Sequence, residues 1–184
     1  MREFIIAAAM EEIRERGLRF TMQDLATRLK VSKRSLYENF TSKEELIGAL
    51  LEIILADMER QEEQICASAA KPTEKLRLLL TVHPYDVEMF NKNIYEDLKR
   101  MFPAQWQVVE KARLKRQERL ERLIEEGVAA GELRPIHIGI VSQLLRGAFD
   151  SFTSYSFLDK NALTYKEAMR ELVDILLQGL ERKS

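Results

Sequence analysis

FTMQDLATRLKVSKRSLYENFTSKEELIGAL, residues 20–50, is the stretch that decides the fold. Its apolar residues recur at helical spacing in two short segments, which are separated only by residues 30–32. Thr21 and Ser32 each precede one of these segments, where a hydroxyl oxygen can accept a hydrogen bond from an unpaired N–H of the first turn. The pattern predicts two short helices joined by a tight turn, with the small Ala26 allowing them to cross closely.

Residues of this stretch also follow an order that is typical of one protein family. They are Thr21, Leu25-Ala26, Val31-Ser32, Leu36-Tyr37, Phe40 and Ser42-Lys43-Glu44-Glu45-Leu46. Together they resemble the N-terminal module of TetR-type (tetracycline-repressor-like) transcriptional regulators, over about residues 4–50. The resemblance implies a helix-turn-helix that binds double-stranded operator DNA.

Two positions depart from the family pattern. Lys30 stands where a glycine often ends the first helix of the pair, and Arg34 stands where a glycine often occurs early in the second. A left-handed backbone at Lys30 would cost up to about 1 kcal/mol relative to glycine. We expect the fold to tolerate this cost, and we expect Arg34 to change what the module reads.

The composition favours an all-α fold of about nine helices. The 184 residues are 46% hydrophobic and 32% charged, with only seven glycines and four prolines for tight turns. We expect a three-helix DNA-binding domain over residues 1–46 and a helical ligand-binding and dimerisation domain over residues 47–184. A single cysteine, Cys66, excludes an internal disulfide, and His83 and His137 lie far apart, so neither a metal nor another cofactor is expected.

Charge is distributed unevenly along the chain. The whole chain carries a formal net charge of −1, yet residues 19–43 contain six basic and two acidic side chains, a net charge of plus four. Such a local excess is expected of a small module that binds phosphates. The short apolar run at the N-terminus is interrupted by acidic residues, so we expect it to be neither a signal peptide nor a membrane span. A cytoplasmic protein is therefore expected.

The other helices are expected where apolar residues keep helical spacing between proline and glycine breaks. Their ranges are 2–16, 42–68, 73–82, 86–102, 104–130, 136–157 and 164–181. On the first of them, Phe4, Ile5, Ala8, Ala9 and Ile13 share one face and should pack against the helix pair. The seven basic and six acidic residues between 104 and 134 alternate at helical spacing, which favours a solvated helix face over a nucleic-acid surface.

The last two expected helices carry more apolar residues than one inward face needs. In the TetR-like family this pair usually forms a four-helix dimer interface with its copy. The resemblance therefore implies a homodimer through residues 136–181, with Gly139 and Gly147 allowing close approach. An ordinary buried hairpin in a monomer is the alternative.

Lys33 and Arg34 lie in the first turn of the second helix of the pair, the end that enters the major groove when a helix-turn-helix binds DNA. We expect Arg34 to read a base, with Ser35 or Lys33 assisting. By resemblance, Tyr37 and Lys43 would contact phosphates, and Thr21 would combine a helix cap with a phosphate contact. The alternative for Tyr37 is packing in the core with Phe40.

An unidentified small-molecule effector is expected to bind among the helices of residues 73–157 and to alter DNA binding through the helix that begins at Ser42. The candidate lining residues are Met89, Phe90, Tyr95, Trp106, Phe149 and Phe152. Aromatic and methionine residues at helical spacing also occur in plain cores, so core packing is the alternative for each.

The sequence thus favours a ligand-responsive regulator, a repressor that binds a palindromic operator as a homodimer. One alternative is a helical interaction protein whose helix-turn-helix contacts protein rather than DNA. A small helical enzyme is disfavoured, because the sequence contains no glycine-rich phosphate loop, metal cluster or nucleophile elbow.

Overall fold

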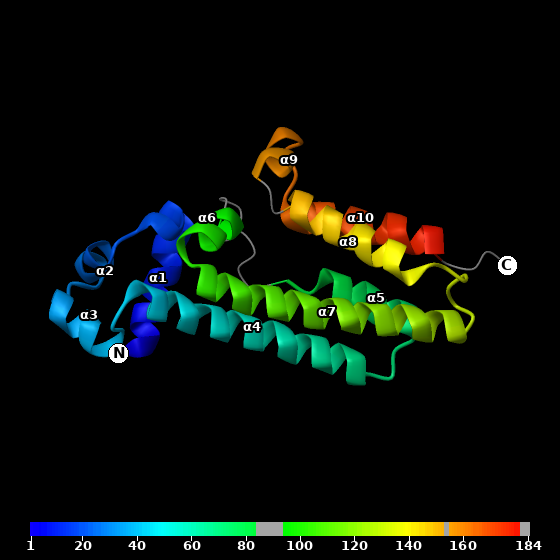
Figure 1. Ribbon diagram of the computed structural model, residues 1–184, viewed down its shortest axis with the longest axis horizontal. Coiled ribbons are helices and arrows are strands. Elements are labelled where there is room, and N and C mark those ends of the chain that lie inside the picture. Colours follow the sequence, from blue (N-terminus) through cyan, green and yellow to red (C-terminus); the bar gives the residue numbers. More distant parts are fainter. Residues whose placement is uncertain (84–93, 153–154, 181–184) are drawn as a thin grey trace. The chain divides into compact units, whose positions relative to one another are not determined.

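The structure, a computed structural model, describes residues 1–83, 94–152 and 155–180. Over these residues it is built of helices, and no strand is assigned there (Figure 1). The helices are α1 (Arg2–Arg16), the 3-10 helix η1 (Gly17–Arg19), α2 (Met22–Leu29), α3 (Lys33–Asn39), α4 (Lys43–Ala67), α5 (Pro72–Thr81), α6 (Ile94–Met101), α7 (Pro103–Ala129), α8 (Ile138–Phe152), α9 (Tyr155–Lys160) and α10 (Tyr165–Leu180). None of these described helices is both long enough and apolar enough to cross a bilayer.

The chain divides into two compact units. The first comprises Met1–Ala56 and Tyr85–Glu110, and the second comprises Asp57–Pro84 and Lys111–Ser184. Helices α4 and α7 each contribute residues to both units. The first unit therefore holds the helix pair predicted from residues 20–50, and the second holds α5, α8, α9 and α10.

In the first unit, α1 packs against α2, α2 packs against α3, and η1 contacts both α1 and α6. The core residues are Ile5, Ala9, Ile13, Leu18, Phe20, Met22, Leu25, Ala26, Leu36, Phe40, Leu46, Ile47, Leu50, Leu51, Ile94, Leu98, Phe102, Trp106 and Val109. The expectation that Phe4 belongs to the packed face of α1 was wrong, because Phe4 is exposed. The buried residues of this helix include Glu12. The spacing of apolar residues could not reveal a buried glutamate.

In the second unit, residues that are distant in the sequence form hydrogen bonds with the free backbone groups at the ends of helices. The Glu132 carboxylate accepts hydrogen bonds from the backbone N–H and the hydroxyl of Thr73, at 3.2 and 2.7 Å, and so caps the first turn of α5. Arg134 donates from its backbone to Leu180 O and from its side chain to Gly179 O, which satisfies the last carbonyls of α10. The turn after α7 thus fixes both α5 and α10.

A buried ion cluster joins α4, α5 and α7 within this unit. Glu62 is only 3% exposed, and its carboxylate accepts from Arg116 at 3.0 Å and from Arg119 at 2.6 Å. Arg116 also donates to the backbone oxygens of Leu79 and Val82, where α5 ends. The prediction of a solvated charged face was therefore wrong for these two arginines. Helical spacing indicates pairing within one helix and is blind to a carboxylate on another.

The apolar core of the second unit lies around α5, α7, α8 and α10. Within the helix expected over residues 136–157, the structure gives α8 up to Phe152 and α9 from Tyr155, and residues 153–154 lie outside the described residues. The helix expected over 86–102 is observed from Ile94 to Met101, and its first part lies outside the described residues.

Candidate nucleic-acid interface

Helix α2 begins with a complete capping box. The Thr21 hydroxyl accepts a hydrogen bond from the Asp24 N–H at 3.1 Å, and the Asp24 carboxylate accepts from the Thr21 N–H at 2.7 Å. The bonds from the Thr21 side chain and backbone, with a smaller contribution from Arg16, lower the pKa of Asp24. Thr21 is exposed as a residue, and its hydroxyl also donates to the Asp24 carboxylate at 2.7 Å.

The turn between α2 and α3 uses the left-handed backbone that the sequence raised for Lys30. Lys30 has φ 55° and ψ 39°, its N–H donates to Thr27 O, and the next N–H, of Val31, donates to Ala26 O. This pair of bonds is the Schellman arrangement that usually employs glycine. Ser32 then caps α3 by accepting from the Ser35 N–H at 3.1 Å, as expected.

Helix α3 presents a polar face from a fixed base. Its Leu36 is fully buried, whereas Lys33, Arg34 and Tyr37 are exposed and Ser35 is half-buried. The Arg34 side chain is 88% exposed and forms an ion pair with Glu38 at 3.0 Å, one turn further along the helix. Tyr37 is 42% exposed, so the alternative of complete packing in the core does not apply to it.

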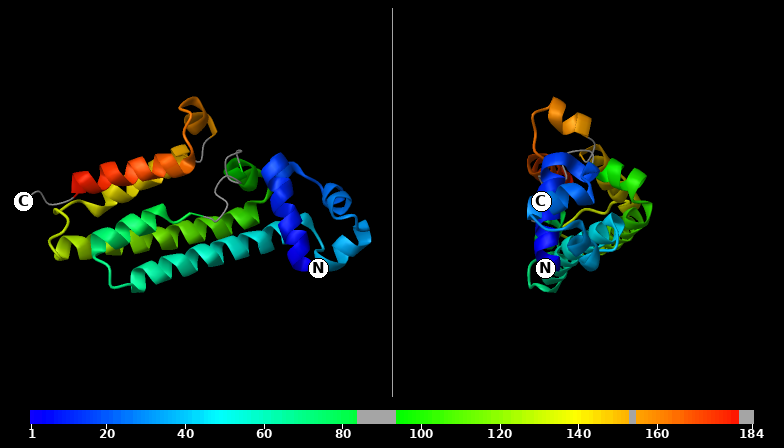
Figure 2. Two further views of the ribbon diagram at one scale, coloured as in Figure 1. Left: turned by 180° about the vertical axis from the view of Figure 1, so that it is seen from behind. Right: turned by 90° about the vertical axis from the view of Figure 1, so that its left-hand side faces the viewer.

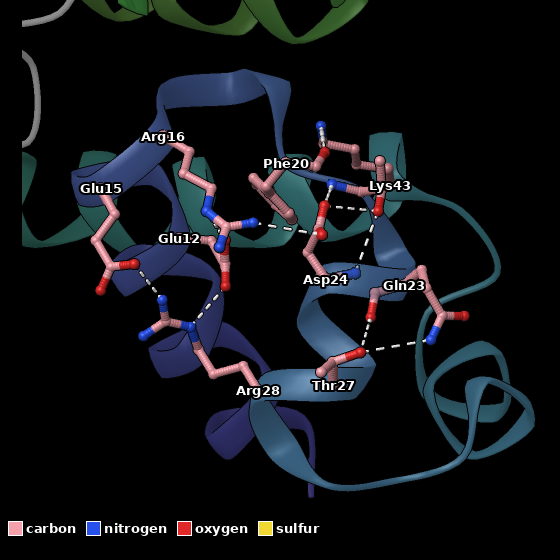
Figure 3. A network of polar contacts seen from close by, with 10 residues as sticks. Glu12, Glu15, Arg16, Phe20, Gln23, Asp24, Thr27, Arg28 and Lys43 are labelled. Carbon is pink, nitrogen blue, oxygen red and sulfur yellow. Dashed lines mark hydrogen bonds and ion pairs between the residues drawn. The ribbon is translucent and has the colours of Figure 1, made fainter.

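A polar network holds α1 against α2 (Figure 3). The buried Glu12 accepts from Arg28 at 2.6 Å, and Arg28 also pairs with Glu15. Arg16 reaches both Glu12, at 3.6 Å, and Asp24, at 3.3 Å. The hydrogen bonds to Glu12 and then Glu15 raise the pKa of Arg28. Sequence reasoning missed this network, because Glu12 and Glu15 read as ordinary surface charges of α1.

The turn between α3 and α4 is fixed in a similar way. Arg2 donates to Asn39 O at 2.5 Å, forms an ion pair with Glu45 at 3.3 Å and stacks over the Phe40 ring at 4.0 Å. The Glu45 carboxylate accepts in turn from the Thr41 N–H at 2.7 Å. These bonds, first from Thr41 and then from Arg2, lower the pKa of Glu45.

These pairings reduce the positive charge that is free to face DNA. Of the six basic residues between 19 and 43, Arg28 pairs with α1, Arg19 pairs with Asp97 at 3.7 Å, and the Lys43 ammonium turns inward. Lys30 and Lys33 are exposed, and neither has an ion-pair partner among the described residues. Together with Arg34 they concentrate positive charge on the α2–α3 turn and the first turn of α3.

The described aromatic residues expected to line an effector site take part in three ring pairs, one in the first unit and two in the second. In the first unit, Tyr95 and Trp106 meet edge to face, with ring centroids 6.2 Å apart. In the second unit, Phe149 meets Tyr165 edge to face at 6.3 Å, and Phe152 stacks on Phe157 at 5.5 Å. Met89 and Phe90 lie outside the described residues.

Comparison with known proteins identifies the same N-terminal module. The family model of bacterial regulatory proteins of the tetR family matches residues 5–50. The chain is 26% identical over 177 residues to the uncharacterized HTH-type transcriptional regulator YvaF of Bacillus subtilis, covering 96% of this chain and 93% of that one. It is 29% identical over 185 residues to the HTH-type transcriptional repressor KstR2 of Mycobacterium tuberculosis, covering 97% and 90% of the two chains.

Solved structures share the fold over the whole chain. The ketosteroid transcriptional regulator KstR2 superimposes with a TM-score of 0.77, at 22% identity over 99% of this chain and 95% of that one. AibR, solved with isovaleryl coenzyme A and operator DNA, superimposes with a TM-score of 0.69, at 18% identity over 95% and 96% of the two chains. With the capped helix-turn-helix of residues 21–39 and the match at residues 5–50, the N-terminal module of this chain is that of the tetR family of bacterial regulatory proteins.

Proposed function

We propose that this protein is a transcriptional repressor that binds a palindromic operator as a homodimer and is released by a small molecule. The observation that carries the proposal is helix α3, which buries Leu36 and presents Lys33, Arg34 and Tyr37 to solvent between two fixed turns. A helix held in this way can enter the major groove without ordering its own ends on binding. A regulator of this kind acts where the DNA is, in the cytoplasm, and needs no catalysis.

The contacts follow from the chemistry of the side chains. The Arg34 guanidinium can donate two parallel hydrogen bonds to O6 and N7 of a guanine, after leaving its exposed pair with Glu38. Lys33 and Ser35 flank it in the first turn and can assist base reading or bind phosphate. Tyr37 and Thr21 are exposed residues, and their hydroxyls are proposed to contact phosphates, which would fix the register of the module on the duplex.

The second subunit is proposed to bind on α8 and α10, which lie side by side in the second unit (Figures 1 and 2). Ile140 is 66% exposed, Leu144 54% and Ile175 68%, an apolar surface that a lone chain leaves in water. A Cβ added at Gly147 would meet nothing within 4 Å, so this glycine keeps the surface of α8 open for a neighbouring helix. Val173, Leu176 and Leu177, in contrast, are used in the core of their own chain.

The effector is proposed to bind beside aromatic residues named from the sequence, either Tyr95 and Trp106 of the first unit or Phe149 and Phe152 of the second. AibR, which shares this fold, was solved with both a coenzyme A thioester and operator DNA, which supports a regulator that responds to a metabolite. A ligand that binds one arrangement of the helices more tightly shifts the population toward that arrangement, to an extent set by the difference in affinity. The distance between the two α3 helices of a dimer would change with it. Helix α4 begins beside the DNA-binding helices and supplies residues to both units, so it is the proposed connection.

Fluorescence anisotropy with a labelled random duplex tests DNA binding before the operator is known. We expect the logarithm of the association constant to fall linearly with the logarithm of the salt concentration, because each neutralised phosphate contributes about −0.9 to that slope. Absence of duplex binding at low salt would contradict the proposal and favour the alternative, a helical protein-interaction module.

A further inference from the structure

Helix α1 buries one charged side chain on its packed face. Ile5, Ala9 and Glu12 follow the i, i+4, i+7 spacing that places three residues on one side of a helix. Ile5 and Ala9 are fully buried, and Glu12 is only 2% exposed. A carboxylate in this position has lost nearly all of its contact with water, so its partners within the protein decide what its burial costs and what it does.

One oxygen of Glu12 is bound by the last turn of α2. Oε1 accepts from Arg28 Nε at 2.6 Å, and a second nitrogen of the same guanidinium donates to Glu15, one turn further along α1. A planar guanidinium that bonds two carboxylates of one helix has little freedom to turn. The end of α2 is therefore held at a fixed place beside α1.

The other oxygen, Oε2, is linked to the first turn of α2 through Arg16. Oε2 is buried without a hydrogen-bond donor among the described residues, and Arg16 Nε lies 3.6 Å from it. The same arginine reaches Asp24 at 3.3 Å, and Asp24 completes the capping box with Thr21. Figure 3 shows the Glu12 carboxylate between Arg16 and Arg28. One buried carboxylate is thus linked to both ends of α2.

The orientation of α2 determines that of α3. Helix α3 follows α2 after only three residues, 30–32. The turn between them is fixed by the left-handed backbone of Lys30 and by the bond from the Val31 N–H to Ala26 O. A rotation of α2 on α1 would therefore move α3 and its exposed Arg34 by a similar amount.

An apolar residue at position 12 would suit the packed face better if only stability mattered. Burying an ion pair removes both charges from water, and their attraction repays this cost only with excellent geometry. A buried oxygen without a donor adds to the cost. Apolar contacts have no preferred direction, however, and they permit small rotations of α2 that a hydrogen-bonded pair resists. The pair suits a role in orientation better than a role in stability.

We infer that Glu12 is a positioning residue for operator recognition. With Arg28 and Arg16 it fixes the orientation of α2 on α1, and through α2 that of α3, with no gain in the stability of the fold. The inference rests on the proposed function, since this orientation matters only if α3 reads DNA. Glu12 acts through the two arginines and makes no contact with DNA itself.

The test replaces the pair with apolar side chains, in Glu12→Met, Arg28→Met and the double variant. Glu11→Met combined with Arg14→Met is the control, because this exposed pair lies within α1. Urea denaturation gives the midpoint of each protein. Competition anisotropy gives the ratio of operator to random affinity where each protein is folded, with an operator selected from a random pool. A phosphate contact made by Arg28 would lower both affinities alike and so cancel in this ratio.

For the double variant we expect a midpoint at least as high as that of the parent and an operator preference reduced about tenfold, a size typical of coupling within one network. Each single variant should lose as much preference as the double variant, because the two residues act as a unit. Glu12→Gln keeps the shape and an acceptor for Arg28, so it should recover part of the preference. The control should change neither quantity.

A folded double variant with the operator preference of the parent would overturn the inference, because recognition would then not depend on the pair. A double variant that fails to fold, or whose midpoint falls well below that of the parent, would overturn it too, since the pair would then be a stabilising contact. Failure of the proposed function is a separate result, in which the unaltered protein binds no duplex, and the inference would fall with it.

Discussion

At the scale of single residues, the module departs from its family at two positions, and the structure gives each a different consequence. Lys30 occupies the left-handed turn with its side chain at the surface. The Arg34 side chain is 88% exposed on α3, although it forms an ion pair with Glu38. One departure therefore concerns stability, and the other concerns recognition.

Replacing Arg34 with alanine should reduce discrimination between operator and random DNA by about 1–3 kcal/mol, because a bidentate contact to one base is lost. Arg34→Lys keeps the charge but loses the two parallel donors, so it should bind random DNA normally and still discriminate poorly. Competition anisotropy measures both affinities. An unchanged operator preference in Arg34→Ala would exclude Arg34 from base reading.

Lys30→Gly should raise the free energy of unfolding by up to about 1 kcal/mol, since glycine adopts the left-handed backbone without a Cβ clash. Lys30→Asn, which also tolerates this region, removes the same charge and separates the backbone effect from the electrostatic one. Urea denaturation of the three proteins measures the difference. A less stable glycine variant would show that the lysine side chain contributes more than the turn costs.

At the scale of helices, the ends carry much of the specificity of the fold. Thr21 and Ser32 cap their own helices, and both caps could be predicted because each bond is local in sequence. The cap of α5 comes instead from Glu132, 59 residues from Thr73, which no local pattern reveals. Local chemistry could therefore be predicted, and pairing across the fold could not.

Glu132→Gln should lower the free energy of unfolding by about 1 kcal/mol near neutral pH, because the amide oxygen can still accept from Thr73 but the added strength of bonds to a charged acceptor is lost. The bonds from Thr73 lower the pKa of Glu132 below its ordinary value of 4.5. The stabilisation is therefore complete above pH 4.5 and is lost as the pH falls through the lowered pKa. Thermal denaturation from pH 7 to pH 3 should show the two proteins converging, with the exposed Glu126→Gln as control. A constant difference would contradict this assignment.

At the scale of the whole molecule, the all-α class followed from composition and spacing, and most helix boundaries were predicted to within a few residues. The buried charges were not, since Glu12 and Glu62 look like surface residues until their arginines on other helices are known. The inward direction of Lys43 was hidden for the same reason. Sequence spacing describes one helix at a time, whereas these groups are defined by pairs of helices.

Dimerisation is the prediction that belongs to this scale. Leu144→Glu places a charge in the middle of the proposed interface, so it should convert a dimer of twice 21.5 kDa into a monomer and weaken operator binding. Leu114→Glu changes a comparably exposed leucine on α7 and should leave the dimer intact. Sedimentation velocity at micromolar concentration measures both. A monomeric unaltered protein would refute the interface.

Selection of bound sequences from a pool of random duplexes tests the central claim most directly. Two α3 helices related by twofold symmetry should enrich a palindrome whose half-sites lie about 34–36 Å apart, one turn of DNA, or a multiple of that distance. Such a palindrome would establish DNA binding, base reading and dimerisation in one measurement. A pool that stays random, or that enriches an unpaired half-site, would contradict the claim.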